Sequence, residues 1–183
     1  MAARKNTGSA GATDETETIT DPVEWANHYW SKFDLGTHQE AFLAMSSTLR
    51  LHRLMTDTVE TALRAYSLNL TDYLVLMTLE LSDNGTRLLS RLAWNLLVHA
   101  TTITLATDRL EGRGLLYRHP HPTDRRATCV TITDEGRELT RKATDALREV
   151  KFGLTGSTLA QQQRLLAVLG ALRSAAGDID RAH

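Results

Sequence analysis

The stretch that decides the fold is residues 99–136, which read HATTITLATDRLEGRGLLYRHPHPTDRRATCVTITDEG. His99 stands where a helix cap belongs, and apolar residues follow it at helical spacing until two glycines end the pattern. Residues 115–118 predict a strand, and residues 127–133 predict a returning strand with alternating apolar side chains. The loop between them, residues 119–126, contains prolines and adjacent arginines. The stretch therefore predicts a helix followed by a β-hairpin with a basic tip.

The predicted helix from His99 to Glu111 carries four threonines, although threonine is a mediocre helix former. Contacts of their hydroxyl groups with phosphates and base edges would account for them, and their methyl groups can touch the thymine methyl group. At least one of the four is expected to pack internally. Leu105 either faces a DNA groove or packs on the neighbouring helix, and packing is slightly favoured. The candidates for contact with the major groove are His99, Thr101, Thr102, Thr104 and Leu105.

Shorter helices are predicted upstream of this stretch. Residues 70–81 form a largely apolar pattern that has Thr71 as its cap and stops at residues 83–85, Asp-Asn-Gly. Residues 88–97 predict another short helix. Polar side chains around it would hold DNA phosphates and fix the register without reading sequence. These phosphate candidates are Arg87, Ser90, Arg91 and Asn95, together with Arg125 in the hairpin loop.

The flanking segments predict further helices. A helix starts at Asp21-Pro22, and after Gly36 an amphipathic pattern could run for about thirty residues, which is longer than a small domain is wide. A helix of that length favours contact with a second subunit, and a kinked core helix is the alternative. Thr133 caps another helix, and residues 157–176 predict a last amphipathic one. The predicted organisation is a tail (1–20), N-terminal dimerisation helices (21–69), a DNA-binding lobe (70–133) and C-terminal dimerisation helices (134–183).

Composition limits the function classes. The chain has 183 residues, of which 42% are hydrophobic, so it can bury one good core. Its formal net charge is −1, so any basic surface must be local. A lone cysteine excludes an internal disulfide framework, and the absence of a signal peptide or long apolar run predicts a cytoplasmic protein without membrane contact. Residues 1–20 hold too little apolar surface to fold and predict a disordered tail.

The order of these elements resembles the MarR family of bacterial regulators. The similarity runs from Leu70 to Leu139, and its most specific motifs are Asp-Arg-Leu-Glu at 108–111, Pro-Thr-Asp-Arg-Arg at 122–126 and Thr-Ile-Thr-Asp-Glu-Gly at 131–136. The tryptophan-bearing helix at 21–33 is similar to the PecS-like branch, which has an added N-terminal helix. The resemblance implies a mainly α fold with a small β-hairpin wing, in which a winged helix-turn-helix is joined to a helical region that forms a homodimer.

The resemblance also assigns roles in the wing. It implies that Arg126 enters the DNA minor groove, that Asp124 orients it, and that Arg125 contacts phosphates. A narrow A·T groove concentrates negative potential, which suits a held guanidinium. The alternative is a solvated turn with a weak surface ion pair. The chain departs from relatives at Leu74, where urate-responsive members are acidic, and at Leu105, where many are polar or basic.

An effector pocket is expected between the dimer helices and the reading lobe. Aromatic and cationic side chains are available there to bind a small aromatic or acidic molecule. For the tryptophans, packing in the dimer core is the equally favoured alternative. The pocket candidates are Trp25, Trp30, Arg50, His52, Arg53, Tyr66 and Tyr73.

The sequence carries no recognisable catalytic chemistry. The seven histidines are dispersed, with no His-x-x-x-His spacing, and there is no paired-cysteine motif or glycine-rich phosphate loop. We therefore expect no catalytic residues, metal or cofactor. Cys129 is interpreted as a small packing residue. The histidines are interpreted as accidental surface residues. The alternative is that His119 and His121, which flank prolines in the wing, add charge below neutral pH and so tighten DNA binding on acidification.

Together these features predict a sequence-specific regulator of transcription that binds double-stranded DNA. It would act as a homodimeric repressor on a pseudo-palindromic operator and be released by a small aromatic or acidic ligand. One alternative is a winged-helix module that docks a protein partner and never reads DNA. Another is a constitutive DNA binder without an effector.

Overall fold

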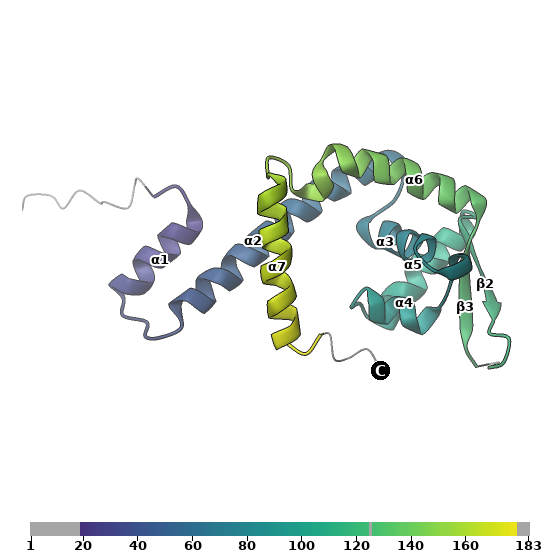
Figure 1. The fold of residues 1–183 in the computed structure, drawn as a ribbon, viewed down its shortest axis with the longest axis horizontal. Coiled ribbons are helices and arrows are strands. Elements are labelled where there is room, and N and C mark those ends of the chain that lie inside the picture. Colours follow the sequence, from purple (N-terminus) through teal and green to yellow (C-terminus); the bar gives the residue numbers. More distant parts are fainter. Residues whose placement is uncertain (1–18, 125, 179–183) are drawn as a thin grey trace, which may run out of the picture. The chain divides into compact units, whose positions relative to one another are not determined.

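The computed structural model describes residues 19–124 and 126–178. Most of the predicted tail, residues 1–18, lies outside this range, as does Arg125. One compact unit of the described chain ends at His52 and another begins at Arg53. The division falls within the long helix α2 (Gln39–Leu63), which is shown with the other elements in Figure 1.

The N-terminal unit contains helix α1 (Pro22–Lys32) and the first part of α2. The helix α1 begins as predicted, because the Asp21 carboxylate accepts a 2.8 Å hydrogen bond from the Val23 N–H and a proline follows at the first helical position. The turn into α2 is held by the Trp30 indole, whose Nε1 donates to the Gly36 carbonyl at 3.0 Å. The Trp30 ring also lies 4.9 Å from that of Phe42, measured between centroids. These contacts form a helical hairpin.

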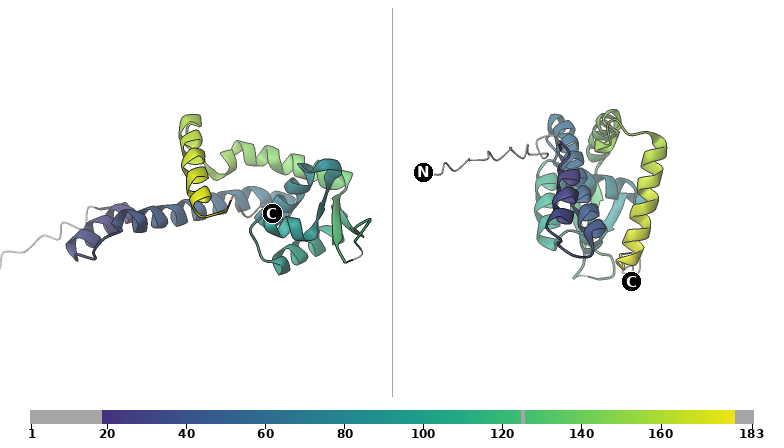
Figure 2. Two further views of the ribbon diagram at one scale, coloured as in Figure 1. Left: turned by 60° about the horizontal axis from the view of Figure 1, so that its bottom comes forward. Right: turned by 90° about the vertical axis from the view of Figure 1, so that its left-hand side faces the viewer.

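The second unit contains the other helices and an antiparallel sheet. Its helices are α3 (Leu70–Glu80), α4 (Leu89–Asn95), α5 (Ala100–Gly112), α6 (Asp134–Glu149) and α7 (Leu159–Ala175). The strands β1 (Thr86–Leu88), β2 (Leu116–Pro120) and β3 (Thr128–Ile132) pair in the order β1-β3-β2. The register sets Thr86 opposite Thr131, and Leu116 opposite Ile132. Figure 2 shows the β2–β3 hairpin extending beside the cluster of α3, α4 and α5. This arrangement confirms the expected winged helix-turn-helix.

The core of this unit lies between the sheet and the helices. Leucine and isoleucine side chains from α3, α4 and α5 pack there against the strands, and α6 adds the buried face of Ala143 and Leu147. The largest fully buried side chains include Leu63, Leu76, Leu79, Leu92, Ile103, Leu110, Leu116 and Leu147. Burial of each such side chain contributes about 2 kcal/mol to folding. The core therefore fixes α5 against the hairpin.

Some sequence predictions of local structure were wrong. The cap of α3 is Asn69 rather than Thr71, because the Asn69 side chain accepts from the Asp72 N–H at 2.8 Å and the Asp72 carboxylate reaches back to the Asn69 N–H. The strand β1 was not predicted. The helix α2 has 25 residues and continues directly into a 3-10 turn that ends at Tyr66, which is close to the expected run of about thirty residues. Among the described residues, no helix is long and apolar enough to span a membrane.

Candidate nucleic-acid interface

The helix α5 presents a polar face to solvent. His99 caps it, with Nδ1 accepting a 3.3 Å hydrogen bond from the Thr101 N–H. Thr101, Thr102 and Thr104 are exposed. Thr107 is buried, and its hydroxyl donates to the Ile103 carbonyl at 2.9 Å. The expectation that at least one of the four threonines packs internally is thereby confirmed.

Leu105 lies on the same exposed face of α5. Its side chain is 54% exposed, whereas Ile103, Ala106 and Leu110 form the buried face. The slightly favoured expectation that Leu105 packs on the neighbouring helix is therefore wrong, because the helical period turns position 105 away from the core. The solvent-facing surface of α5 is consequently a threonine-rich face with one leucine on it.

The phosphate candidates surround the segment that precedes α5. Arg87, Ser90, Arg91 and Asn95 are all exposed. The Arg87 guanidinium is held by a 2.8 Å hydrogen bond from Nε to the Ser82 hydroxyl. The Arg91 guanidinium lies over the Trp94 ring, 6.0 Å from its centroid. These side chains are accessible to a nucleic-acid backbone.

The turn at the tip of the wing is built from side chains that bind backbone N–H groups. The His121 Nδ1 accepts from the N–H groups of Thr123 and Asp124 at 3.4 and 3.3 Å. The Asp124 carboxylate in turn accepts from the Arg126 N–H at 2.9 Å. Among the described residues no ion pair joins this carboxylate to the Arg126 guanidinium, and the carboxylate fixes the backbone of the turn instead. The orientation of the Arg126 guanidinium by Asp124 stays a prediction.

The wing and α4 meet in a groove. Its volume is about 330 Å³, and Ser90 lines it together with Asp124 and Arg126. The structure thus brings a phosphate candidate and both described wing candidates to one place. The remaining wing candidate, Arg125, lies outside the described residues.

Arg118 connects the wing to α5. Its Nη1 forms ion pairs with Asp108 and Glu111 at 2.6 and 3.5 Å, and its Nη2 donates to the Thr104 carbonyl at 3.1 Å. The Glu111 carboxylate also accepts from the Arg118 backbone N–H at 2.8 Å. The sequence pattern alone gave Arg118 no role, although the two acidic residues one helical turn apart on α5 are a signal for such a connection. These bonds fix the angle between the wing and α5.

The residues proposed for an effector pocket belong to both compact units. In the second unit, Tyr73 is buried and its hydroxyl lies 3.1 Å from that of Thr144. In the first, Trp25 is exposed, whereas Trp30 closes the helical hairpin. Their assembly into one pocket stays a prediction.

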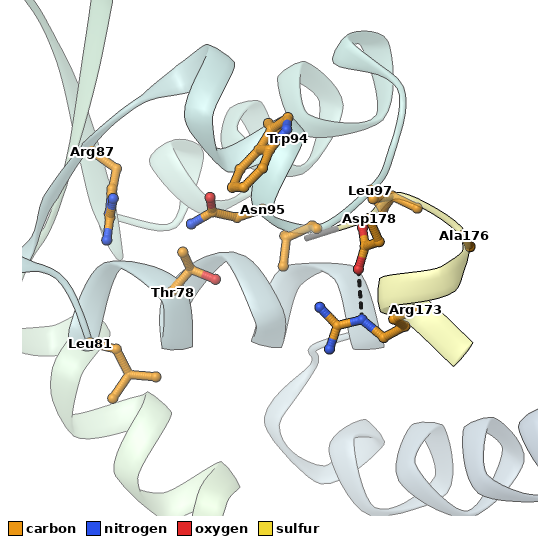
Figure 3. A pocket seen from close by; sticks show the side chains of 10 residues that line it. Thr78, Leu81, Arg87, Trp94, Asn95, Leu97, Arg173, Ala176 and Asp178 are labelled. Atoms are coloured by element: carbon orange, nitrogen blue, oxygen red, sulfur yellow. Dashed lines mark hydrogen bonds and ion pairs between the residues drawn. The ribbon is translucent and has the colours of Figure 1, made fainter. Parts of the chain in front are cut away.

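A different cavity, of about 900 Å³, lies in the second unit between the end of α4 and the end of α7 (Figure 3). It contains the Trp94 indole and the Arg87 guanidinium, and an ion pair of 2.6 Å between Arg173 and Asp178 at its rim. None of the seven pocket candidates lines it. Its lining is Thr78, Leu81, Arg87, Trp94, Asn95, Leu96, Leu97, Arg173, Ala176 and Asp178.

Comparison with known proteins shows which proteins share this arrangement. A family model described as "MarR family" matches residues 68–128. The solved structure of Sco5413, a MarR family transcriptional regulator from Streptomyces coelicolor, is 33% identical, covers 77% of this chain and 98% of its own, and superposes with a TM-score of 0.71. The chain belongs to the MarR family. Its relatives are DNA-binding regulators of transcription rather than enzymes.

Other relatives also span most of the chain. The HTH-type transcriptional repressor IacR from Pseudomonas putida is 28% identical over 170 residues, which are 92% of this chain and 94% of IacR. The M. tuberculosis transcriptional regulator MOSR, solved in complex with DNA, is 27% identical, covers 73% of this chain and 97% of its own, and has a TM-score of 0.58. Membership of the PecS-like branch stays a prediction. Within the described residues, no group of three metal-ligating side chains comes together.

Proposed function

We propose that this MarR family regulator is a cytoplasmic repressor that binds a pseudo-palindromic operator as a homodimer. One observation carries the proposal: the exposed threonine face of α5 and the groove holding Asp124 and Arg126 are joined into one rigid surface by Arg118. A major groove about 12 Å wide admits a helix such as α5, while a wing reaches the adjacent backbone or minor groove. The repressor role is supported by the name of the relative IacR.

In this proposal each side chain has a distinct task. His99, the exposed threonines and Leu105 contact base edges in the major groove. Arg126 enters the minor groove, and Asp124 holds the turn that presents it. The phosphate contacts come from Arg87, Ser90, Arg91, Asn95 and Arg125.

A homodimer is supported by the apolar surface of α7. Among the described residues of α7 no side chain is buried, and leucines on it are exposed. A helix with such a surface needs a partner, and a second copy of the chain would provide it. Two copies would place two reading helices about one helical turn of DNA apart. The exposed apolar residues are Leu159, Leu166, Val168, Leu169 and Leu172.

In this proposal a small aromatic or acidic effector releases the protein from its operator. The cavity beside Trp94 favours it, since an indole and nearby guanidinium groups suit an aromatic acid. The pocket predicted from Trp25, Trp30, Arg50, His52, Arg53, Tyr66 and Tyr73 is the alternative location. A ligand that binds either place should raise the melting temperature of the protein.

The decisive experiment substitutes Arg126→Ala and measures binding to duplexes from the promoter of the protein's own gene by fluorescence anisotropy. We expect the dissociation constant to rise about tenfold and the slope of log K against log salt to fall by about one. Arg141→Ala, which removes an exposed arginine from α6, is the matched control and should bind like the wild type. Unchanged binding by Arg126→Ala would refute the role of the wing. If the wild type bound no fragment in a salt-dependent way, the protein-interaction module would be favoured instead.

A further inference from the structure

An imidazole holds the backbone at each of the elements proposed to contact DNA. His99 lies at the start of α5 and His121 at the wing turn, and each uses Nδ1 as a hydrogen-bond acceptor. We infer that His99 and His121 are positioning residues for DNA binding, which act only as neutral imidazoles, so that acidification weakens the complex. The inference rests on the proposed function, since it concerns the same surface.

His99 is an unusual helix cap. Caps of this kind are mostly serine, threonine, aspartate or asparagine, whose oxygen atoms accept at any physiological pH. In His99 the acceptor is Nδ1, which lies 3.3 Å from the Thr101 nitrogen and 3.0 Å from the Thr101 hydroxyl oxygen. A ring nitrogen accepts only when it carries no proton, so the proton of neutral His99 is on Nε2. Protonation of Nδ1 removes the cap and adds a positive charge at the positive end of the helix.

At the wing turn, His121 likewise accepts its hydrogen bonds only while Nδ1 carries no proton. Its Nδ1 accepts from the N–H groups of Thr123 and Asp124, and Asp124 then accepts from Arg126. Nδ1 also lies 3.3 Å from the Thr123 hydroxyl oxygen, which could accept from a protonated ring, but protonation would place an N–H group against the two backbone N–H groups and break the first link of the chain. The turn that presents Arg126 would lose its order as a result.

His119 differs from both and provides an internal control. Its Nδ1 lies 3.2 Å from the Pro120 carbonyl oxygen, and its Nε2 lies 3.0 Å from the Thr131 hydroxyl oxygen. Both of these oxygens can accept a hydrogen bond, so a fully protonated His119 keeps both contacts. The expectation that wing histidines tighten binding on acidification therefore suits His119 and does not suit His121.

The charged groups around these imidazoles do little to offset the loss of these hydrogen bonds on protonation. Within the described part of the chain, no carboxylate forms an ion pair with His99 or His121. Arg91 is the charged residue of α4, which packs against the start of α5, and Asp124 and Arg126 lie in the wing turn itself. The charged groups of α3 and β2 are paired away from His99, as Asp72 with Arg109, Glu80 with Arg137, and Arg118 with Asp108 and Glu111.

The phosphates of bound DNA oppose the loss of affinity on acidification. Their negative charge favours protonated imidazoles, and added salt screens that attraction while leaving the hydrogen bonds of the caps in place. The loss of affinity on acidification should therefore be larger at high salt than at low salt. This dependence separates the positioning role from a simple charge effect.

The test measures operator affinity of the full chain by fluorescence anisotropy between about pH 8 and about pH 5.5, a range in which imidazoles titrate, at constant ionic strength. A lost cap corresponds to about fivefold in an equilibrium, so we expect the wild-type dissociation constant to rise about tenfold or more on acidification. In the double variant His99→Asn with His121→Asn the acceptors do not titrate, so its affinity should not fall on acidification. His119→Gln leaves both acceptor imidazoles in place, so its affinity should still fall on acidification, by at least as much as that of the wild type.

Wild-type affinity that stays constant or rises in acid would overturn the inference, and so would an equal loss in the double variant. If the single variants are needed because the double variant does not fold, each should lose about half of the effect on a logarithmic scale. An independent readout is the ¹⁵N resonance of each imidazole near pH 8, where Nδ1 of His99 and His121 should carry no proton; a proton found there would also refute the inference. If the wild type bound no DNA at about pH 8, the proposed function would fail, and the nitrogen resonances alone would decide this inference.

Discussion

In the proposed complex, single side chains on the exposed face of α5 would determine which DNA the protein reads. Threonine hydroxyls both donate and accept, so Thr101, Thr102 and Thr104 distinguish bases only modestly. Leu105 carries no polar atom and can discriminate through contact with a thymine methyl group. Its exposure on this face leaves it free to make such a contact.

Substitution of Leu105→Ala is expected to weaken operator binding severalfold while changing the free energy of unfolding by less than about 0.5 kcal/mol, because the side chain is outside the core. Duplexes in which uracil replaces thymine lack the methyl group and provide the matched control. The wild type should lose affinity for such a duplex at the contacted base, and the variant should not. Equal losses in both proteins would show that Leu105 does not contact a thymine methyl group.

Residue 136 must be a glycine because there is no room for a larger side chain, and not because of its backbone conformation. A Cβ atom there would lie 2.1 Å from the Leu115 carbonyl oxygen, whereas one at Gly112 would meet nothing within 4 Å. Gly136→Ala should therefore lower the free energy of unfolding by about 1–3 kcal/mol. Gly112→Ala should be neutral or stabilise the protein by up to about 1 kcal/mol. Chemical denaturation of both variants checks the pair, and equal stabilities would contradict the tight contact between α6 and the Leu115 carbonyl group.

At the level of single residues, part of the candidate site could be predicted from the sequence. The helical period identified the exposed threonines, and the motif around Asp124 and Arg126 located the wing. The period alone did not settle whether Leu105 meets solvent or a neighbouring helix, because that depends on which elements pack together. The contact of Asp124 with the Arg126 backbone depends on the local turn, which residue types do not determine.

At the scale of elements, the angle between α5 and the wing depends on Arg118. Its guanidinium neutralises Asp108 and Glu111, which lie on the same side of α5. Loss of this contact leaves two carboxylates facing each other beside a surface that must approach phosphates. The orientation of the wing is therefore coupled to the electrostatics of the reading helix.

Arg118→Met is expected to raise the dissociation constant for the operator about tenfold or more, with a loss of about 1–2 kcal/mol in the free energy of unfolding. The methionine keeps the apolar length of the side chain and removes its donors. Asp108→Asn, which removes one carboxylate and keeps the shape, should show a smaller loss of affinity. Anisotropy and chemical denaturation measure the two effects. A variant with lower stability but full affinity would mean that this contact serves folding alone.

The elements were predictable where a long periodic pattern or a strong cap marks them, as in α1, α5 and α6. The strand β1 is only three residues long, too short for an alternating pattern to appear. Its structure comes from pairing with β3, more than forty positions later, at Thr86 and Thr131. Asn69 lies before a threonine and an aspartate that can also cap a helix, so the sequence offered competing starts for α3.

At the scale of the whole molecule, the proposed activity requires two copies. Introduction of charge on the exposed apolar face of α7, with Leu169→Glu and Leu172→Glu together, should convert the protein to a monomer and abolish tight operator binding. Since no described residue of α7 is buried within the chain, the winged lobe should keep its fold. Light scattering after gel filtration measures the mass, and Gln163→Glu on the same helix is the control. A wild type that is itself monomeric at micromolar concentration would contradict the proposal.

The pairing of β1 with β3 encloses the reading apparatus in one closed loop of chain. The helices α4 and α5, the strand β2 and the wing turn all lie between these two paired strands in the sequence, so both ends of that segment, residues 86–132, are fastened to each other. We expect a segment closed in this way to be exchangeable as one unit. Exchange of residues 86–132 between members of the family would transfer operator preference while the helices outside it remained unchanged, which gives evolution and engineering a natural unit for recombination.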